Sequence, residues 1–70
     1  MTSYQLSKIA SHLKRHRIRL GLSRDELARA ARVNYNTIIK LESGANKNPT
    51  IKTLIGIAKV FRVRVEDLIR

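Results

Sequence analysis

The middle of the chain most constrains the fold, because it carries the signals of two short helices with a tight connection between them. Ser23, followed three residues later by Glu26, has the capping-box pattern that begins a helix. Asn34 is a favourable N-cap for the next helix, over residues 35–43, and Gly44 ends it. A connection this short forces the two helices to pack against each other.

Similar signals divide the rest of the chain into three further helices. Residues 3–20 are the first, with a Thr2–Gln5 capping box and Gly21 at its end. A fourth helix begins after Thr50 and a short fifth near Val65. Helical spacing places these apolar residues on the inward sides of the helices: Leu6, Ile9, Ala10, Leu13, Leu20, Leu27, Ala28, Ala31, Ile38, Leu41, Ile51, Leu54, Ile57, Ala58, Phe61 and Leu68, with Ile69 as a further candidate. We therefore predict an all-α, five-helix single domain over residues 1–70.

The charge of the chain favours an anionic partner. Fifteen Lys and Arg face five Asp and Glu, so the net charge is +10 over 70 residues. Six bases and no acid lie between Met1 and Arg24. A surface this basic repels itself, and nucleic acid is the commonest polyanion that relieves the repulsion. The simpler reading is a basic surface that only keeps the protein soluble.

Composition argues against several other classes of protein. Without cysteine there is neither a disulfide nor a thiolate zinc site. No apolar run approaches the ~20 residues of a membrane span, and no signal-peptide core follows Met1. We therefore expect a cytoplasmic protein that does not enter the membrane.

The acidic residues all have structural explanations. Asp25 and Glu26 fall in the first turn of one predicted helix, and Glu66 and Asp67 in the first turn of another, where the helix dipole favours negative charge. Glu42 lies late in the third helix, beside core positions. No carboxylate pair remains for acid–base catalysis and no acidic cluster for a metal. We therefore expect neither an enzyme nor a cofactor.

Two histidines show the spacing of metal ligands. His12 and His16 are four residues apart on the first helix, so both lie on one face. No third ligand and no accompanying Glu is evident in the sequence. We interpret them as surface histidines rather than a zinc site.

Four segments of the chain, in this order and at these spacings, are typical of one family: LGLSRDELA, VNYNTI, LESG and NPTIKTLIGIAK. With them the chain resembles the lambdoid phage Cro/repressor, or XRE-like, helix-turn-helix proteins over about residues 6–69. The resemblance implies a five-helix all-α domain whose second and third helices form the helix-turn-helix. It also implies binding to operator DNA as a dimer, and a partly buried ion pair between Arg17 and Glu42.

The chain departs from the family pattern at three positions. Arg32 and Arg62 stand where the family often has Gly, after the second and fourth helices. A left-handed backbone there costs a non-Gly residue on the order of 1 kcal/mol. Arg64 is a poor N-cap for the fifth helix, so that helix is expected to fray.

One side of the third helix offers polar groups. A helical wheel turning ~100° per residue places Asn34, Leu41 and Glu42 on the inner side with Ile38, and Lys40 opposite with Asn36 and Ser43. The resemblance implies base contacts at Tyr35, Asn36, Thr37 and Lys40. Asn36 can pair with adenine, Lys40 can donate to guanine, and Ile39 beside them suits a thymine methyl. The alternative reading is an ordinary solvated helix face.

A second set of residues is expected to hold the duplex without reading its sequence. Helix N-termini and cationic side chains favour phosphate oxygens. The candidates are Arg24, Asn34, Ser43, Asn46, Lys47, Asn48, Thr50 and Lys52. For Lys47 and Lys52 the alternative is simple solubility.

Three functions compete on this reading. The first is a DNA-binding transcriptional regulator, a dimeric repressor that inserts the helix over residues 35–43 into the major groove of a near-palindromic operator. The second is an antitoxin whose main partner is a toxin and which binds DNA for autoregulation; the chain shows no extra toxin-wrapping tail. The third is a basic amphipathic peptide at a membrane surface, which residues 4–20 alone suggest but the later capped helices do not. Double-stranded DNA and a second copy of the chain are the expected partners.

Overall fold

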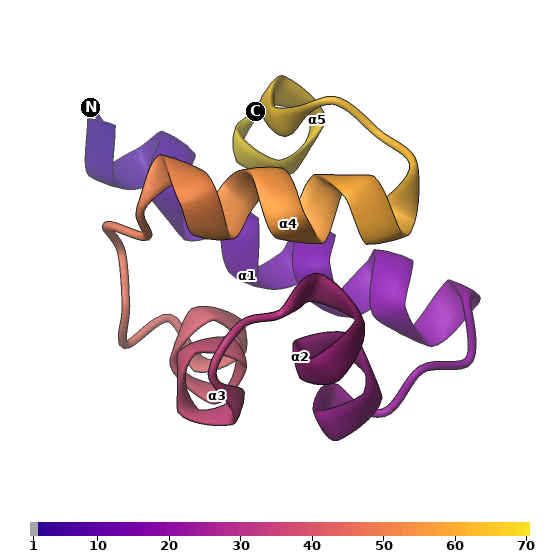
Figure 1. The fold of residues 1–70 in the computed structure, drawn as a ribbon. Helices are drawn as coiled ribbons and strands as arrows, with labels where there is room; N and C mark the ends of the chain where they lie inside the picture. The colour runs from indigo at the N-terminus through magenta and orange to yellow at the C-terminus, as the bar shows by residue number, and fades with distance from the viewer. Residues whose placement is uncertain (1) are drawn as a thin grey trace.

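Five helices follow one another along the part of the chain that the structure describes, which comprises the backbone of residues 2–70 and the side chains of residues 8–70. In this computed structural model they are α1 (Thr2–Arg19), α2 (Arg24–Ala31), α3 (Tyr35–Ser43), α4 (Ile51–Phe61) and α5 (Val65–Ile69). No strand occurs in the same range. Figure 1 shows α4 lying above α2 and α3, with α5 next to α4. The predicted all-α, five-helix fold is confirmed.

Local hydrogen bonds explain where the helices begin. The Glu26 N–H donates to the Ser23 hydroxyl at 3.0 Å, and the Ser23 N–H donates to the Glu26 carboxylate at 2.8 Å, which completes the capping box. The Thr50 hydroxyl caps α4 by accepting from the Thr53 N–H at 3.2 Å. These predicted starts are confirmed, whereas the Thr2–Gln5 box falls outside the described side chains.

Two arginines have left-handed backbone at helix ends. Arg32 follows α2 with φ 58°, and Arg62 follows α4 with φ 59°. At both ends the next residue closes the turn: Val33 N–H donates to the Ala28 carbonyl at 2.9 Å, and Val63 N–H donates to the Ala58 carbonyl at 3.1 Å. The left-handed conformation expected at both positions is confirmed.

The first turn of α5 is stabilised by an acid inside the helix and not by the side chain of its N-cap residue. Arg64 is its N-cap residue, and a guanidinium cannot accept a hydrogen bond from the helix. Instead the Asp67 carboxylate accepts from the Arg64 N–H at 3.0 Å. The fraying expected from the poor cap residue is therefore countered by the acid three positions later.

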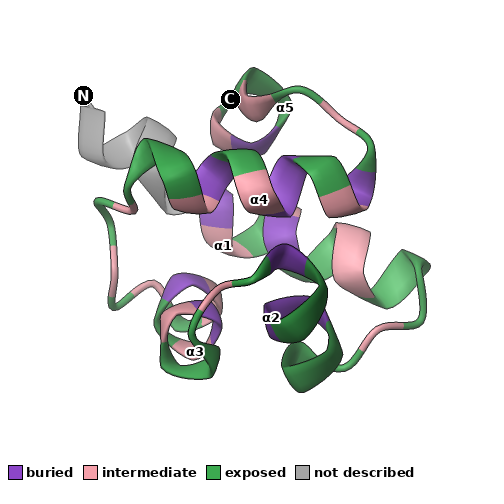
Figure 2. Cartoon of the chain, in the orientation of Figure 1, coloured by how far each residue is buried: buried purple, intermediate pink, exposed green. Residues whose placement is uncertain are grey.

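An aliphatic core lies where the helices meet, visible as the buried residues in Figure 2. It contains Ile9, Leu13, Leu27, Ala28, Ala31, Ile38, Leu41, Leu54, Ile57, Ala58, Phe61 and Leu68. Two core predictions are wrong, because Leu20 is 51% exposed and Ile51 is 63% exposed. Leu20 lies in the turn beyond the last residue of α1, and Ile51 is the first residue of α4, so neither reaches the core. Ala10 is half-buried, and Leu6 falls outside the described side chains.

A glycine lets α4 approach the end of α2. A Cβ atom on Gly56 would lie 2.6 Å from the carbonyl oxygen of Ala31, closer than van der Waals contact allows. Only a residue without a side chain can therefore occupy this crossing without moving a helix. The close approach determines where α4 lies relative to the connection between α2 and α3.

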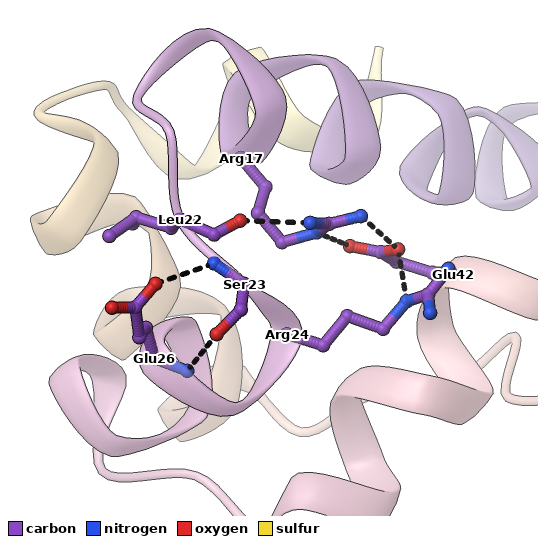
Figure 3. A network of polar contacts seen from close by, with 6 residues as sticks. All are labelled: Arg17, Leu22, Ser23, Arg24, Glu26 and Glu42. Carbon is purple, nitrogen blue, oxygen red and sulfur yellow. Dashed lines mark hydrogen bonds and ion pairs between the residues drawn. The ribbon is translucent and has the colours of Figure 1, made fainter.

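One carboxylate joins three elements near the surface of the core. Arg17 on α1 donates from Nε to Glu42 Oε2 at 2.6 Å and from Nη2 to Oε1 at 3.1 Å (Figure 3). Its Nη1 donates to the Leu22 carbonyl at 2.8 Å. Arg24, at the start of α2, donates from Nε to Glu42 Oε1 at 2.9 Å. The Glu42 side chain, from α3, is only 3% exposed, so its charge is neutralised almost entirely by these two arginines.

The two arginines keep this carboxylate ionised. Burial by itself would raise the pKa of Glu42, but the hydrogen bonds from Arg17 and Arg24 outweigh burial and hold the pKa below its usual range. The Glu26 carboxyl also has a lowered pKa, because the backbone N–H and hydroxyl of Ser23 bond to its charged form.

Breaking the buried pair should destabilise the fold. We expect Glu42→Gln to lower the free energy of unfolding by about 3 kcal/mol, because it leaves the Arg17 charge without its counter-ion. Urea unfolding followed by circular dichroism measures the loss. Arg24→Gln is the matched control, and we expect about 1 kcal/mol or less because Arg24 is 46% exposed. Arg17→Met and Glu42→Met made together should cost clearly less than the sum of the costs of Arg17→Met and Glu42→Met made singly. Simple additivity of the two costs would contradict the pairing.

The same carboxylate should make stability depend on acid. Because the folded-state pKa of Glu42 lies below its usual 4.5, the unfolded chain binds the proton more readily. Its contribution to stability is therefore complete above about pH 5.5 and is lost as the pH falls through 4.5 toward the folded-state pKa. We expect unfolding free energies measured from pH 6 to about pH 3 to fall less steeply in Glu42→Gln than in the parent. Equal slopes of unfolding free energy against pH in the two proteins would show that Glu42 does not cause the acid dependence.

Candidate nucleic-acid interface

The outward side of α3 carries the polar groups that the sequence analysis singled out. Asn36, Lys40 and Tyr35 are exposed, while Ile38 and Leu41 on the same helix are buried. Thr37 and Ile39 are half-buried at the margins of the exposed face. Nothing in the described part of the subunit covers the Asn36 amide or the Lys40 ammonium group, so both can reach a ligand.

The start of α3 depends on Asn34, which the helical wheel placed on the inner side. That placement is wrong, because Asn34 is exposed and has the extended backbone of an N-cap (φ −59°, ψ 138°), to which a wheel does not apply. Its side-chain oxygen accepts from the Asn36 N–H at 2.8 Å. The acceptor is thus used to cap the helix, and the amide NH₂ is the group of this side chain that can still donate.

The loop between α3 and α4 is shaped by its own hydrogen bonds. The Asn46 N–H donates to the Lys40 carbonyl at 3.0 Å, and the Asn46 side-chain oxygen accepts from the Asn48 N–H at 2.9 Å. The Ser43 hydroxyl donates to the same Lys40 carbonyl at 3.2 Å. Lys47, next to Asn46, is exposed. A turn of defined shape therefore presents a cation directly after the exposed end of α3.

The remaining phosphate candidates lie at two helix starts. Thr50, the N-cap of α4, and Lys52 in its first turn are exposed. Arg24, the first residue of α2, is held by Glu42 and still 46% exposed. Sequence reasoning missed this contact, since nothing in the local pattern shows that residues 18 positions apart meet. The carboxylate that α3 contributes therefore orders a cation at the N-terminus of α2.

The acids of the chain leave its cations in surplus. Asp25 pairs with Arg29 at 2.8 Å, and both Glu66 and Asp67 lie within 4 Å of Arg64. Glu26 and Glu42 are engaged in the capping box and the buried cluster described above. Since every carboxylate has a partner, the exposed cations near α3 and α4 face solvent without acidic neighbours to neutralise them.

Both histidines are half-buried at the surface of the fold, and each contacts other residues there. His16 is half-buried and stacks on Phe61 of α4, with ring centroids 5.2 Å apart. Burial, followed by the charge of Arg19, lowers the pKa of His16. His12 contacts the Arg70 carbonyl and the Arg15 guanidinium. No cluster of three metal-binding side chains occurs among residues 8–70, and no helix described there is long and apolar enough to cross a membrane.

Comparison with known proteins places this architecture in a family. A helix-turn-helix family model matches residues 13–68. Two uncharacterised helix-turn-helix transcriptional regulators of Archaeoglobus fulgidus are 36% and 34% identical over 58 residues, which is 83% of this chain and 81% and 80% of theirs. A third, from Methanocaldococcus jannaschii, is 38% identical over 56 residues, 80% of this chain and 83% of its own. The solved structures gave no significant match. The family match and the five-helix fold together show that the chain belongs to the XRE-like helix-turn-helix family.

Proposed function

We propose that this chain is a sequence-specific DNA-binding transcriptional repressor that reads the major groove with α3. The observation that carries the proposal is the exposure of Asn36 and Lys40 on one side of a helix whose other side is buried. An α-helix fits the width of the major groove, and base edges there are read by amide and ammonium groups. The names of the relatives, as transcriptional regulators, support the same function.

Each outward side chain of α3 has a defined chemistry toward bases. The Asn36 amide suits the N6 and N7 edge of adenine, and Lys40 suits O6 and N7 of guanine. Ile39 offers an apolar surface to a thymine methyl group, while the hydroxyls of Tyr35 and Thr37 donate or accept at either base edge or phosphate. These five residues form the proposed base-reading set.

A second set positions the duplex through its phosphates. Arg24 would bind beside the N-terminus of α2, where backbone N–H groups and the helix dipole also attract an anion. The loop and the start of α4 would contribute Ser43, Asn46, Lys47, Asn48, Thr50 and Lys52, and Asn34 would donate from its amide. Such contacts add affinity for any sequence and set the register of α3 in the groove.

A dimer and a steric mechanism follow from the size of the reading helix. The nine residues of α3 reach only a few base pairs, so two copies on one face of the duplex are needed for a selective site. Two-fold symmetry then predicts a near-palindromic operator, and occupancy overlapping a promoter would block transcription. The chain would act by binding rather than catalysis, with residues 1–70 as one unit, in the cytoplasm where its operator is accessible.

Selection of binding sites from random duplexes tests the function directly. We expect a near-palindromic consensus with half-site centres about 34 Å apart, because each copy occupies one turn of the groove on the same face. Gel shifts at fixed salt should show the selected duplex binding at least about 10³-fold more tightly than random duplex. A ratio near one between the affinities for selected and random duplex would contradict the repressor proposal.

Two matched substitutions separate reading from positioning. Asn36→Ala should relax the preference at one or two base pairs by about 1–3 kcal/mol each, because it removes an amide that discriminates bases. Lys47→Ala should weaken selected and random duplexes equally and reduce the slope of log affinity against log salt by about 1. Affinities measured on single-base variants of the selected site, at several salt concentrations, distinguish the two effects. The same pattern from both variants would contradict the assignment.

A further inference from the structure

A groove lies between α4 and the connection from α2 to α3. Figure 1 shows this connection running below α4. The groove is open to solvent and has a volume of about 780 Å³. The close approach that Gly56 permits forms part of its wall, together with the left-handed turn at Arg32. Its lining combines cationic and apolar side chains.

The charge of the groove has one sign. Arg32, Lys52 and Lys59 line it, and its lining contains no carboxylate. All three residues are exposed, and none forms an ion pair within residues 8–70. Three cations around one depression attract an anionic ligand more strongly than scattered surface charges do.

The apolar part of the lining narrows the choice of ligand. Val33 and Val60 pack against the core from one side and line the groove on the other, and Ile55 is 42% exposed within it. Covering such side chains is favourable only for a ligand that itself carries apolar groups. A phosphate backbone alone would satisfy the cations and leave the apolar lining without a partner.

We propose that this groove is the docking site for an acidic segment of a partner protein, one that carries carboxylates together with apolar side chains. A second copy of the chain is a poor occupant, because its acids are already engaged with Arg17, Arg24, Arg29 and Arg64 or in the capping box at Ser23. Charge complementarity therefore favours a different, acidic polypeptide.

The position of the groove couples this docking to DNA. Its lining includes Asn34, Thr37 and Lys52, which are also in the proposed DNA-contacting sets. A polypeptide in the groove and a duplex on α3 would compete for these side chains, so the acidic partner would release the protein from its operator. This competition rests on the proposed function, whereas binding of the polypeptide itself does not.

A labelled acidic peptide tests the docking site. The probe is a fluorescein-labelled 16-residue peptide of alternating Glu and Leu pairs, and the control peptide has Ser in place of Leu at equal charge. By fluorescence anisotropy without DNA, we expect the Leu-containing peptide to bind at least about tenfold more tightly, because only it covers the apolar lining. Equal binding of the two peptides would overturn the proposal, because charge attraction alone would then explain it.

Matched variants locate the peptide on the protein. Lys59→Glu and Ile55→Ser should each weaken binding at least about tenfold, whereas Lys14→Glu should change it less than about twofold. Lys14 is exposed on α1 outside the groove, so it makes the same change in net charge elsewhere. Circular dichroism checks that each variant is folded, and amide shifts of Thr53 and Gly56 report the site independently. An equal loss of peptide affinity in Lys14→Glu, or amide shifts confined to residues outside the groove, would overturn the docking-site proposal.

Competition with the selected duplex separates the possible occupants. Displacement of the peptide by the duplex supports the coupling, and simultaneous binding overturns it while leaving the repressor function untouched. If Lys59→Glu weakens duplex binding as much as peptide binding, the groove is a phosphate site instead. If Ile55→Ser abolishes self-association in sedimentation, the groove belongs to the dimer, and the acidic-partner proposal is overturned.

Discussion

The buried carboxylate of Glu42 is the interaction that ties α3 to the rest of the fold. It accepts hydrogen bonds from Arg17 on α1 and Arg24 on α2, so one side chain of α3 is tied to both neighbouring helices. An unpaired charge at 3% exposure would be costly, and the observed rotation of α3 about its axis avoids this cost. That rotation turns Ile38 and Leu41 inward and leaves Asn36 and Lys40 outside. Pairing of this acid and burial of the apolar side together set which side of α3 faces outward.

The use of acids within the fold also explains the charge of the surface. Each carboxylate serves a helix start or an ion pair, as Glu26 does at Ser23 and Asp25 at Arg29. Within residues 8–70 none of them forms an ion pair with the exposed lysines of α3, α4 and the loop between them. The resulting net charge of +10 repels itself across a small domain. A bound polyanion relieves that repulsion and is therefore linked to stability as well as to recognition.

Sequence reasoning succeeded where the information is local and failed where it depends on tertiary contacts. The caps at Ser23 and Thr50 were predictable, because a cap involves residues three positions apart. Leu20 and Ile51 were assigned to the core by periodicity, yet a helical pattern does not show which turn of a helix reaches the core. The role of Gly56 was missed because it depends on which helix crosses α4. The base and phosphate contacts stay predictions, since no nucleic acid tests them.

The crossing at Gly56 connects the fold to both proposed binding events. Because α4 lies directly on the Ala31 carbonyl, the turn that contains Arg32 comes beside Lys52 and Lys59 of α4. A bulkier residue at the crossing would push α4 away and separate these cations. The same turn leads directly into Asn34 and the first residues of α3. A ligand held between α4 and this turn would therefore reach the start of α3. Under the two proposals, the same architecture would present α3 to DNA and place a competing site at its edge.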